Sequence, residues 1–369
     1  MLNKLVEKIY KISETKVKEE AKIYDKKSSF PEYILNFLNE TDLKLLLGYH
    51  SNFKTINYHD EAKFYYHASK YCSNIRNYFL VSIGMVGAGV FKFGTHKQKN
   101  EYIKNITKNK AIFSLAITEK NAGSDINSIR TTYKFKNNKF IINGTKTWIT
   151  LGGKAKFFLL LANGEKGLIL FFVKKNKSIQ TKLLKGIISN KGSFISELKI
   201  NNLILKKEDI LGGDAKYTLS ILEYILINGR SIASMAGAAM SEAALEEAIN
   251  FSKERIQFGK RTFQYQQIQE IFSNASVEIE SLKLLSSKSF EIKRKNINKG
   301  KFYANVAKFK SSKVINQTTS KLMEVFGANS NSNKFNIERY DREAKAFMFI
   351  EGTSQIISQL ISSYLIMKY

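Results

Sequence analysis

The pattern of apolar and polar positions divides the chain into three parts, of which the first is helical. Over residues 2–24, apolar residues recur every three or four positions with Lys and Glu between them, which predicts an amphipathic helix. Pro31 is suited to the start of a further helix. The apolar segment 78–93 contains three glycines and predicts a buried helix that packs closely against a neighbour. We therefore expect an N-terminal helical domain over residues 1–110.

The period changes from helical to alternating over residues 111–212. Phe113, Leu115 and Ile117 alternate with smaller residues, which is typical of a strand. Asn137-Asn138 and Asn143-Gly144 are hairpin signals, and more short apolar runs follow, separated by Asn, Gly and Lys. This segment is predicted to form a middle β domain.

The helical period returns after Gly212-Gly213 and predicts a C-terminal helical domain over residues 213–369. Long helices are expected at 215–254, 265–296 and 303–326, and from residue 353 to the end, where apolar positions form one stripe. The chain shows no tandem repeat and no low-complexity linker. We expect the three parts to pack as one body.

Composition adds a strong positive charge, with 59 Lys and Arg against 32 Asp and Glu and a formal net charge of +27. Such a charge attracts polyanions, and nucleic acid is the obvious candidate. Only eight of the basic residues are Arg, however, and no zinc finger, basic zipper or aromatic ribonucleoprotein pattern is present. We attribute the excess of Lys to an AT-rich genome and expect no nucleic-acid partner.

Cysteine and histidine usage indicates that the chain binds no metal. The single cysteine, Cys72, excludes an intramolecular disulfide and a cysteine-rich zinc site. The four histidines, at positions 50, 59, 67 and 96, do not have the spacing of metal ligands.

No apolar run reaches the ~18 residues of a membrane span, and the N-terminus has no signal-peptide core. We therefore expect a cytoplasmic protein.

Two blocks in the middle segment contain candidate binding residues. The first runs from Leu115 to a Gly123-Ser124-Asp125 turn, whose N–H groups and hydroxyls suit phosphate oxygens or polar ring edges. A plain surface turn would have the same composition. The second block contains Trp148, the only tryptophan, between a hairpin and Gly152-Gly153. Such a Trp either belongs to the core or forms the wall of a site for a planar cofactor.

Together with three further blocks, these residues resemble the acyl-CoA dehydrogenase family of FAD-containing flavoproteins. The further blocks are 94–99 (Gly-Thr-His-Lys-Gln-Lys), 255–259 with Gln266 (Arg-Ile-Gln-Phe-Gly), and 339–356, which ends in Ile-Glu-Gly-Thr-Ser-Gln-Ile. The resemblance implies an α+β multidomain fold: an N-terminal α-helical domain, a middle β-barrel-like domain and a C-terminal four-helix bundle.

The resemblance also implies roles for individual residues around FAD. One group would line the flavin ring and its pyrophosphate: Leu115, Ile117, Thr118, Ser124, Trp148 and Thr150. Ser124 could also lie near the phosphates of the thioester ligand. A second group would touch the FAD of a neighbouring subunit: Arg255, Phe258 and Gln266. A third would return to FAD at the start of the last helix: Gly352, Thr353 and Gln355.

Glu351 is the residue that the resemblance implies as the catalytic base. Burial by the apolar run 347–350 would raise its pKa, and the adjacent helix N-terminus would lower it. A Glu before a helix otherwise usually acts as a cap. Some family members carry the base just before an Arg that matches Arg230, where this chain has Gly229. Arg230 is expected either near the substrate or in a core ion pair.

The chain departs from the family pattern at three places. Lys120 stands where the family usually has Pro, and residues 329–333 replace a glycine-rich loop with Asn and Ser. The usual Gln-x-x-Gly-Gly appears as Glu324-Val-Phe-Gly-Ala. A carboxylate near a pyrophosphate is unfavourable unless a cation intervenes. These changes concern the half of the FAD site that lies between subunits.

The leading prediction is an acyl-CoA dehydrogenase that forms a trans-2-enoyl thioester, with Glu351 removing the α-proton and a β-hydride moving to flavin N5. The resemblance implies a homotetramer that passes electrons to an electron-transfer flavoprotein. One alternative is a dehydrogenase or oxidase acting on an acyl group held by an acyl carrier protein, whose acidity would suit a basic enzyme. Another is a flavin-binding homologue without turnover. The sequence does not predict the length of the acyl group.

Overall fold

The N-terminal part is helical in the computed structural model, which describes residues 3–51 and 54–369. The predicted helix over 2–24 is continuous but changes type, and its first position, Leu2, lies outside the described residues. Pro31 precedes a short 3-10 helix. The elements are α1 (Asn3–Ile12), η1 (Ser13–Val17), α2 (Lys18–Lys26), η2 (Glu32–Asn36), α3 (Glu40–Leu47), η3 (Gly48–His50), α4 (Tyr58–Ser69), α5 (Ser73–Asn77), η4 (Tyr78–Gly87), α6 (Ala88–Phe93) and α7 (His96–Thr107).

The predicted buried helix over 78–93 consists of η4, a π-helix, followed by α6. Two of its three glycines lie against α8 (Thr218–Glu254), the long helix that follows the β domain. A Cβ atom at Gly84 would fall 2.2 Å from Cδ1 of Ile232, and one at Gly89 would fall 2.7 Å from Cδ1 of Ile225. Glycine therefore allows the two helices to approach each other closely.

The middle part contains two sheets. A three-stranded sheet has the order β1-β4-β5, with β1 parallel to β4, and a four-stranded antiparallel sheet has the order β2-β3-β7-β6. Along β3 the register with β7 shifts between Ile142 and Gly144 and again between Lys146 and Ile149. The strands are β1 (Phe113–Ala116), β2 (Thr132–Lys136), β3 (Lys139–Ile149), β4 (Phe157–Ala162), β5 (Ile169–Lys174), β6 (Ile179–Leu183) and β7 (Ser196–Leu205).

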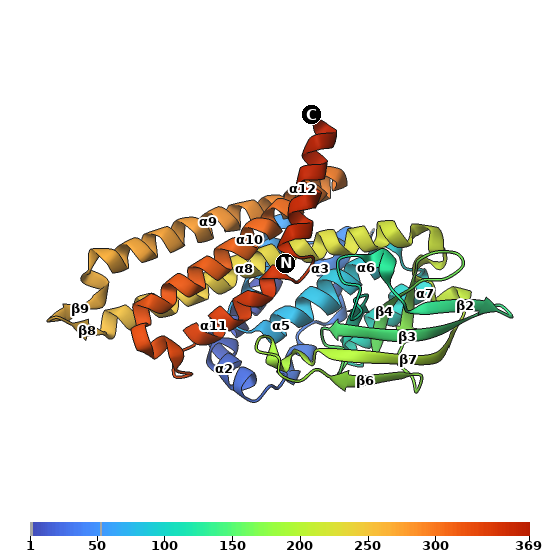
Figure 1. Ribbon diagram of the computed structural model, residues 1–369, viewed down its shortest axis with the longest axis horizontal. Helices are drawn as coiled ribbons and strands as arrows, with labels where there is room; N and C mark the ends of the chain where they lie inside the picture. Colours follow the sequence, from blue (N-terminus) through green and yellow to red (C-terminus); the bar gives the residue numbers. More distant parts are fainter. Residues whose placement is uncertain (1–2, 52–53) are drawn as a thin grey trace.

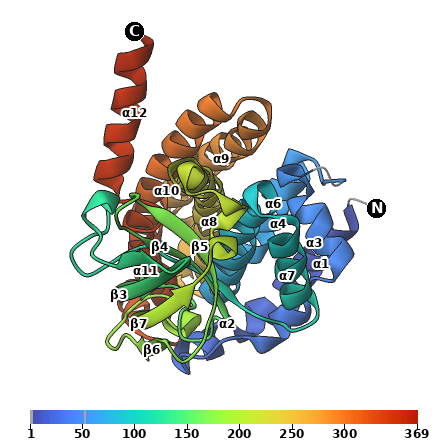
Figure 2. The same ribbon diagram turned by 90° about the vertical axis from the view of Figure 1, so that its right-hand side faces the viewer.

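Three long helices, α8, α9 (Gln266–Lys295) and α10 (Ile297–Phe326), pack along one another in the C-terminal part (Figure 1). A small hairpin, β8 (Ile256–Gln257) and β9 (Lys260–Arg261), lies at the end of this bundle away from the sheets. The fourth helix of the bundle, α12 (Ser354–Lys368), contacts α10 but projects from the body (Figure 2). Only Ile357 of its apolar stripe is buried.

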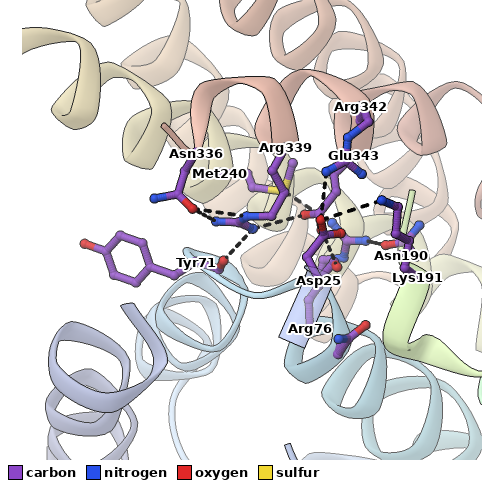
Figure 3. Close-up of polar contacts among 12 residues, drawn as sticks. Asp25, Tyr71, Arg76, Asn190, Lys191, Met240, Asn336, Arg339, Arg342 and Glu343 are labelled. Atoms are coloured by element: carbon purple, nitrogen blue, oxygen red, sulfur yellow. Dashed lines mark hydrogen bonds and ion pairs between the residues drawn. The ribbon is translucent and has the colours of Figure 1, made fainter. Parts of the chain in front are cut away.

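Buried polar groups join the three parts (Figure 3). The Arg76 guanidinium of α5 donates hydrogen bonds to Oδ1 of Asn190, in the loop before β7, and to Sδ of Met240, in α8. In α11 (Ile337–Ala344), Arg339 donates to the Tyr71 carbonyl oxygen over 2.8 Å and Glu343 accepts from Ser73 Oγ over 2.6 Å. These contacts connect all three segments into one body.

Candidate active site

Two of the predicted flavin-binding blocks lie side by side at the ends of β1 and β3. The backbone N–H of Thr147 donates to the Thr118 carbonyl oxygen over 2.8 Å. The Ser114 hydroxyl donates to the Thr150 carbonyl oxygen over 2.5 Å. Leu115, Thr118 and Thr150 are each only partly buried. The two blocks therefore meet at one partly open edge.

Trp148 lies at this edge and does not belong to the core. Its side chain is 61% exposed, and its backbone adopts a left-handed conformation with φ of 58° at a register shift of β3. A bulky residue rarely adopts that conformation, and bulges of this kind commonly re-aim a side chain next to a functional site. The core alternative is therefore wrong, and the flat indole is available to cover a planar ligand.

A buried ion pair fixes the strand ends behind this edge. The Lys146 ammonium is fully buried and donates to Glu119 Oε1 over 2.8 Å and to the Ile117 carbonyl oxygen over 2.9 Å. The Glu119 carboxylate also accepts from the backbone N–H groups of Arg130 and Thr131. Burial opposes ionisation of Glu119, but these hydrogen bonds, led by that from Lys146, leave its pKa below the usual value.

The remaining predicted residues of the flavin group have simpler surroundings. Ile117 is partly buried, and Ser124 is exposed in its turn. The next residue, Asp125, accepts hydrogen bonds from the Asn127 backbone N–H over 3.1 Å and from the Ser128 hydroxyl. Lys120, at the position where the family usually has Pro, is exposed.

Glu351 lies in the turn between η12 (Lys345–Met348) and α12, with a left-handed backbone (φ of 56°). The N-cap of α12 is Thr353, whose side chain accepts from the Ile356 N–H over 3.3 Å. Burial raises the pKa of Glu351 to about 7, against the opposing charges of Arg230 and Lys308. Its carboxyl group is therefore not used as a helix cap and is poised to gain or lose a proton near neutral pH.

Glu351 and Gly229, the two positions at which the resemblance allows a catalytic base, lie next to each other in the structure. A Cβ atom at Gly229 would lie 2.7 Å from Glu351 Oε2, so a side chain at position 229 would collide with that carboxyl group. Arg230, the next residue, is buried and donates to the Glu351 carbonyl oxygen over 3.0 Å and to Asn305 Oδ1 over 2.9 Å. Arg230 therefore holds the backbone of Glu351 through a neutral acceptor.

Gly352 and Thr353 are partly exposed beside Glu351, and Gln355 is exposed on the first turn of α12. By contrast, a single chain does not bring Arg255, Phe258 and Gln266 to Glu351. These three residues are exposed and lie at the hairpin end of the bundle, and Phe258 is 96% exposed (Figure 1). This placement is suited to contact with another molecule.

The predicted site residues do not include Lys146 and Lys308, two buried lysines that bond to the end of β1 and to the segment before Glu351. Lys308 lies in α10 with no exposed surface, among the buried Ala304, Ala307 and Ser311. The available signal was a Lys on the otherwise small and apolar face of a predicted helix. Nothing in a helical period distinguishes such a Lys from one that extends to water.

Neither a metal centre nor a membrane span is found in the described part of the chain. No group of three or more His, Cys, Asp or Glu side chains within residues 3–51 and 54–369 could hold a metal ion. None of the helices in these ranges is long and apolar enough to cross a bilayer.

Comparison with known proteins identifies relatives over most of the chain. The sequence model for "Acyl-CoA dehydrogenase, C-terminal domain" matches residues 219–366, and that for "Acyl-CoA dehydrogenase, middle domain" matches residues 114–203. An acyl-CoA dehydrogenase of Bacillus subtilis is 29% identical over 75% of this chain and 74% of its own. A caffeyl-CoA reductase–Etf complex subunit of Acetobacterium woodii is 28% identical over 77% of this chain and 76% of its own.

Solved structures share the fold over nearly the whole chain. A glutaryl-CoA dehydrogenase from Mycobacterium smegmatis in complex with FADH2 aligns with a TM-score of 0.89 and 21% identity, over 98% of this chain and 93% of its own. A prolyl acyl carrier protein oxidase aligns with a TM-score of 0.85 and 23% identity, over 98% and 97%. The likeness covers all three parts of the molecule.

Proposed function

Because the chain belongs to the acyl-CoA dehydrogenase family, we propose that it is an FAD-dependent enzyme that converts an acyl-CoA thioester to the trans-2-enoyl thioester. The observation that carries this proposal is the Glu351 carboxyl group, whose pKa is raised to about 7 and which occupies the space left by Gly229. A general base is most effective when its pKa lies near the working pH.

Glu351 is the group that accepts the α-proton of the thioester. Its ionised form takes the proton at a carboxylate oxygen, and partial desolvation raises the proton affinity of that oxygen. Arg230 fixes the backbone of Glu351 through the 3.0 Å hydrogen bond to its carbonyl oxygen. The backbone N–H of Glu351 is then a candidate donor to the thioester oxygen, where negative charge develops.

The partly open edge formed by β1 and β3 would hold the flat ring of FAD. Trp148 would cover one face of the ring, and Leu115, Ile117, Thr118 and Thr150 would line it, with Ser124 near the pyrophosphate or the phosphates of the thioester ligand. Gly352, Thr353 and Gln355 would complete the site beside Glu351. FAD supplies the acceptor for the β-hydride, its N5 atom.

A second subunit would complete each FAD site, within a homotetramer. Arg255, Phe258 and Gln266 are exposed together at the far end of the bundle, which supports this role. Glu324, the departure from the family pattern, pairs with Lys321 over 2.7 Å. That cation reduces the repulsion between Glu324 and a pyrophosphate, although an exposed pair contributes little free energy.

An electron-transfer flavoprotein is the electron acceptor that the relatives favour. The Acetobacterium relative is named as a subunit of a complex with Etf. Reoxidation of the reduced enzyme by purified electron-transfer flavoprotein, and slow reoxidation by oxygen, is the result expected for a dehydrogenase. Fast reoxidation by oxygen would indicate an oxidase.

A substrate on an acyl carrier protein is the second candidate. The formal net charge of +27 favours an acidic partner, and one structural neighbour is an acyl carrier protein oxidase. The experiment is an anaerobic titration of the flavin-loaded protein with acyl-CoA thioesters of increasing length and with the same acyl groups on a carrier protein. Loss of the flavin absorbance with the CoA series supports the first proposal, and loss with the carrier series alone supports the second. Flavin that no thioester reduces would favour a homologue without turnover.

A further inference from the structure

Lys308 is a fully buried lysine whose hydrogen-bond partners are neutral. Its ammonium group donates to the Phe347 carbonyl oxygen over 2.6 Å and to the Ser312 hydroxyl over 2.8 Å. A buried ammonium without a carboxylate bonded to it costs free energy. Burial lowers the pKa of Lys308 to about 8, the charge of Glu351 opposes this shift, and that of Arg230 adds to it.

The partners of Lys308 fix the segment that leads to Glu351. The Phe347 carbonyl oxygen also accepts from the Ser312 hydroxyl over 2.7 Å, so two donors of α10 hold it. The Phe347 ring packs against the Arg76 guanidinium, 4.9 Å from the ring centre. One turn earlier, the Asn316 side-chain amide donates to the Ala344 carbonyl oxygen over 2.9 Å. The η12 segment is thus anchored from α10 and from α5.

Two buried cations on different helices bond to the backbone at and just before Glu351, Arg230 to the carbonyl oxygen of Glu351 itself and Lys308 to that of Phe347. Arg230 lies on α8 and Lys308 on α10, and the charge of each lowers the pKa of Glu351. Burial lowers the pKa of Arg230, and the charges of Glu351 and of a further carboxylate, Glu223, oppose this shift. Glu223 is itself exposed and paired with Lys301. Glu351 is therefore the carboxyl group that responds to both buried cations.

We propose that Lys308 is a positioning residue for Glu351: it anchors the Phe347 carbonyl and supplies a buried positive charge that favours the ionised form of the base. This inference rests on the proposed function, in which Glu351 must be ionised to accept a proton. Without the charge, a larger fraction of Glu351 would hold a proton at neutral pH and be unable to act.

The test compares Lys308→Met with Ser312→Ala. The first removes the charge, and the second removes one donor to Phe347 but keeps the charge. The measurement is the titration of the Glu351 carboxyl group by infrared difference spectroscopy on the flavin-loaded protein without substrate, with the band identified by its loss in Glu351→Gln. We expect Lys308→Met to raise the midpoint by about one pH unit, and Ser312→Ala to leave it in place.

An unchanged midpoint in a folded Lys308→Met protein would overturn the inference and leave Lys308 a structural role. If that variant does not fold, Lys308→Gln removes the charge and keeps an N–H donor for the Phe347 carbonyl. The titration midpoint of Glu351 in Lys308→Gln then tests the inference in the same way. The pH profile of flavin reduction by a thioester should shift in parallel, because activity is lost as pH falls through the pKa of Glu351. Wild-type flavin that no thioester reduces would refute the proposed function, while the infrared midpoint would still decide the role of Lys308.

Discussion

At the scale of single residues, Glu351 combines an unfavourable backbone conformation with an unfavourable environment for its charge. A left-handed conformation costs a non-glycine residue about 1 kcal/mol or more, and desolvation opposes the ionised carboxylate. Both unfavourable features belong to one residue, whose carboxyl group lies against Gly229. Strain at such a position is common in functional sites.

The desolvation cost predicts that Glu351→Gln stabilises the protein at alkaline pH. Since the pKa of Glu351 rises from 4.5 to about 7 on folding, the native state binds more protons than the unfolded state between these values. The stability contributed by wild-type Glu351 therefore falls as pH rises through 7. We expect Glu351→Gln to gain roughly 1–3 kcal/mol over wild type at pH 8 and much less at pH 5.

Guanidinium unfolding at the two pH values measures this difference. The control is Glu324→Gln, which makes the same chemical change at an exposed carboxylate and leaves Glu351 in place. An equal effect of Glu351→Gln at both pH values would contradict the raised pKa.

The sequence predicts roles for Glu351, Trp148 and Arg230 because short motifs contain them, and these roles stay predictions. It did not identify Lys308 or the role of Lys146, because the burial of a lysine depends on residues far away along the chain. The carbonyl that holds Lys308, that of Phe347, lies 39 positions later. Such contacts are set by packing and leave no local pattern.

At the scale of elements, the joint between β1 and β3 depends on the Glu119–Lys146 pair. Removing one member of a buried ion pair leaves the other charge uncompensated, which costs about 3–5 kcal/mol. We therefore expect Lys146→Met to lose stability of this order and to weaken FAD binding, because the carbonyl of Ile117 loses its donor.

Chemical unfolding and a flavin titration test this prediction, with Lys139→Met, an exposed position in the same strand, as the control. The double variant Lys146→Met with Glu119→Gln should recover part of the lost stability, because Gln removes the uncompensated charge and keeps an acceptor oxygen for the backbone N–H groups of Arg130 and Thr131. A Lys146→Met protein within 1 kcal/mol of the control would show that the pair does not brace this joint.

Most long elements could be predicted from periodicity, and boundaries that depend on tertiary contacts could not. The helix predicted from residue 303 begins at Ile297, because Asn296 caps it through the Lys299 N–H. A Cβ atom at Gly300 would lie 2.4 Å from Cα of Lys293, so glycine lets α9 and α10 turn sharply against each other. The sequence Asn-Ile-Asn-Lys-Gly alone has the composition of a loop.

At the scale of the whole molecule, the α, β, α order follows from the change of hydrophobic period, but the packing of the three parts does not. Arg76 and Asn190 are 114 positions apart and meet in a buried hydrogen bond. The hydrophobic pattern also does not show that α12 projects or that the hairpin is exposed, since their apolar residues resemble those of a core.

The exposed hairpin predicts that assembly and FAD binding are coupled. If the proposed contact with a second subunit exists, Phe258→Ser should lower the affinity for FAD about tenfold or more and favour smaller assemblies, because that contact would lose an aromatic side chain. Sedimentation and a flavin titration measure the two effects. Ile204→Ser, which alters an exposed apolar residue of β7, is the matched control, and equal behaviour of the two variants would argue against a contact through the hairpin.

The central claim is that Glu351 removes the α-proton of a thioester while the flavin is reduced. The most direct measurement is anaerobic stopped-flow reduction of the flavin by the fastest-reacting thioester, with and without deuterium at its α-carbon, in the wild type and in Glu351→Gln. We expect a primary isotope effect in the wild type, and in Glu351→Gln a rate at least 1,000-fold lower with FAD still bound. A Glu351→Gln protein that is reduced at the wild-type rate would contradict the account.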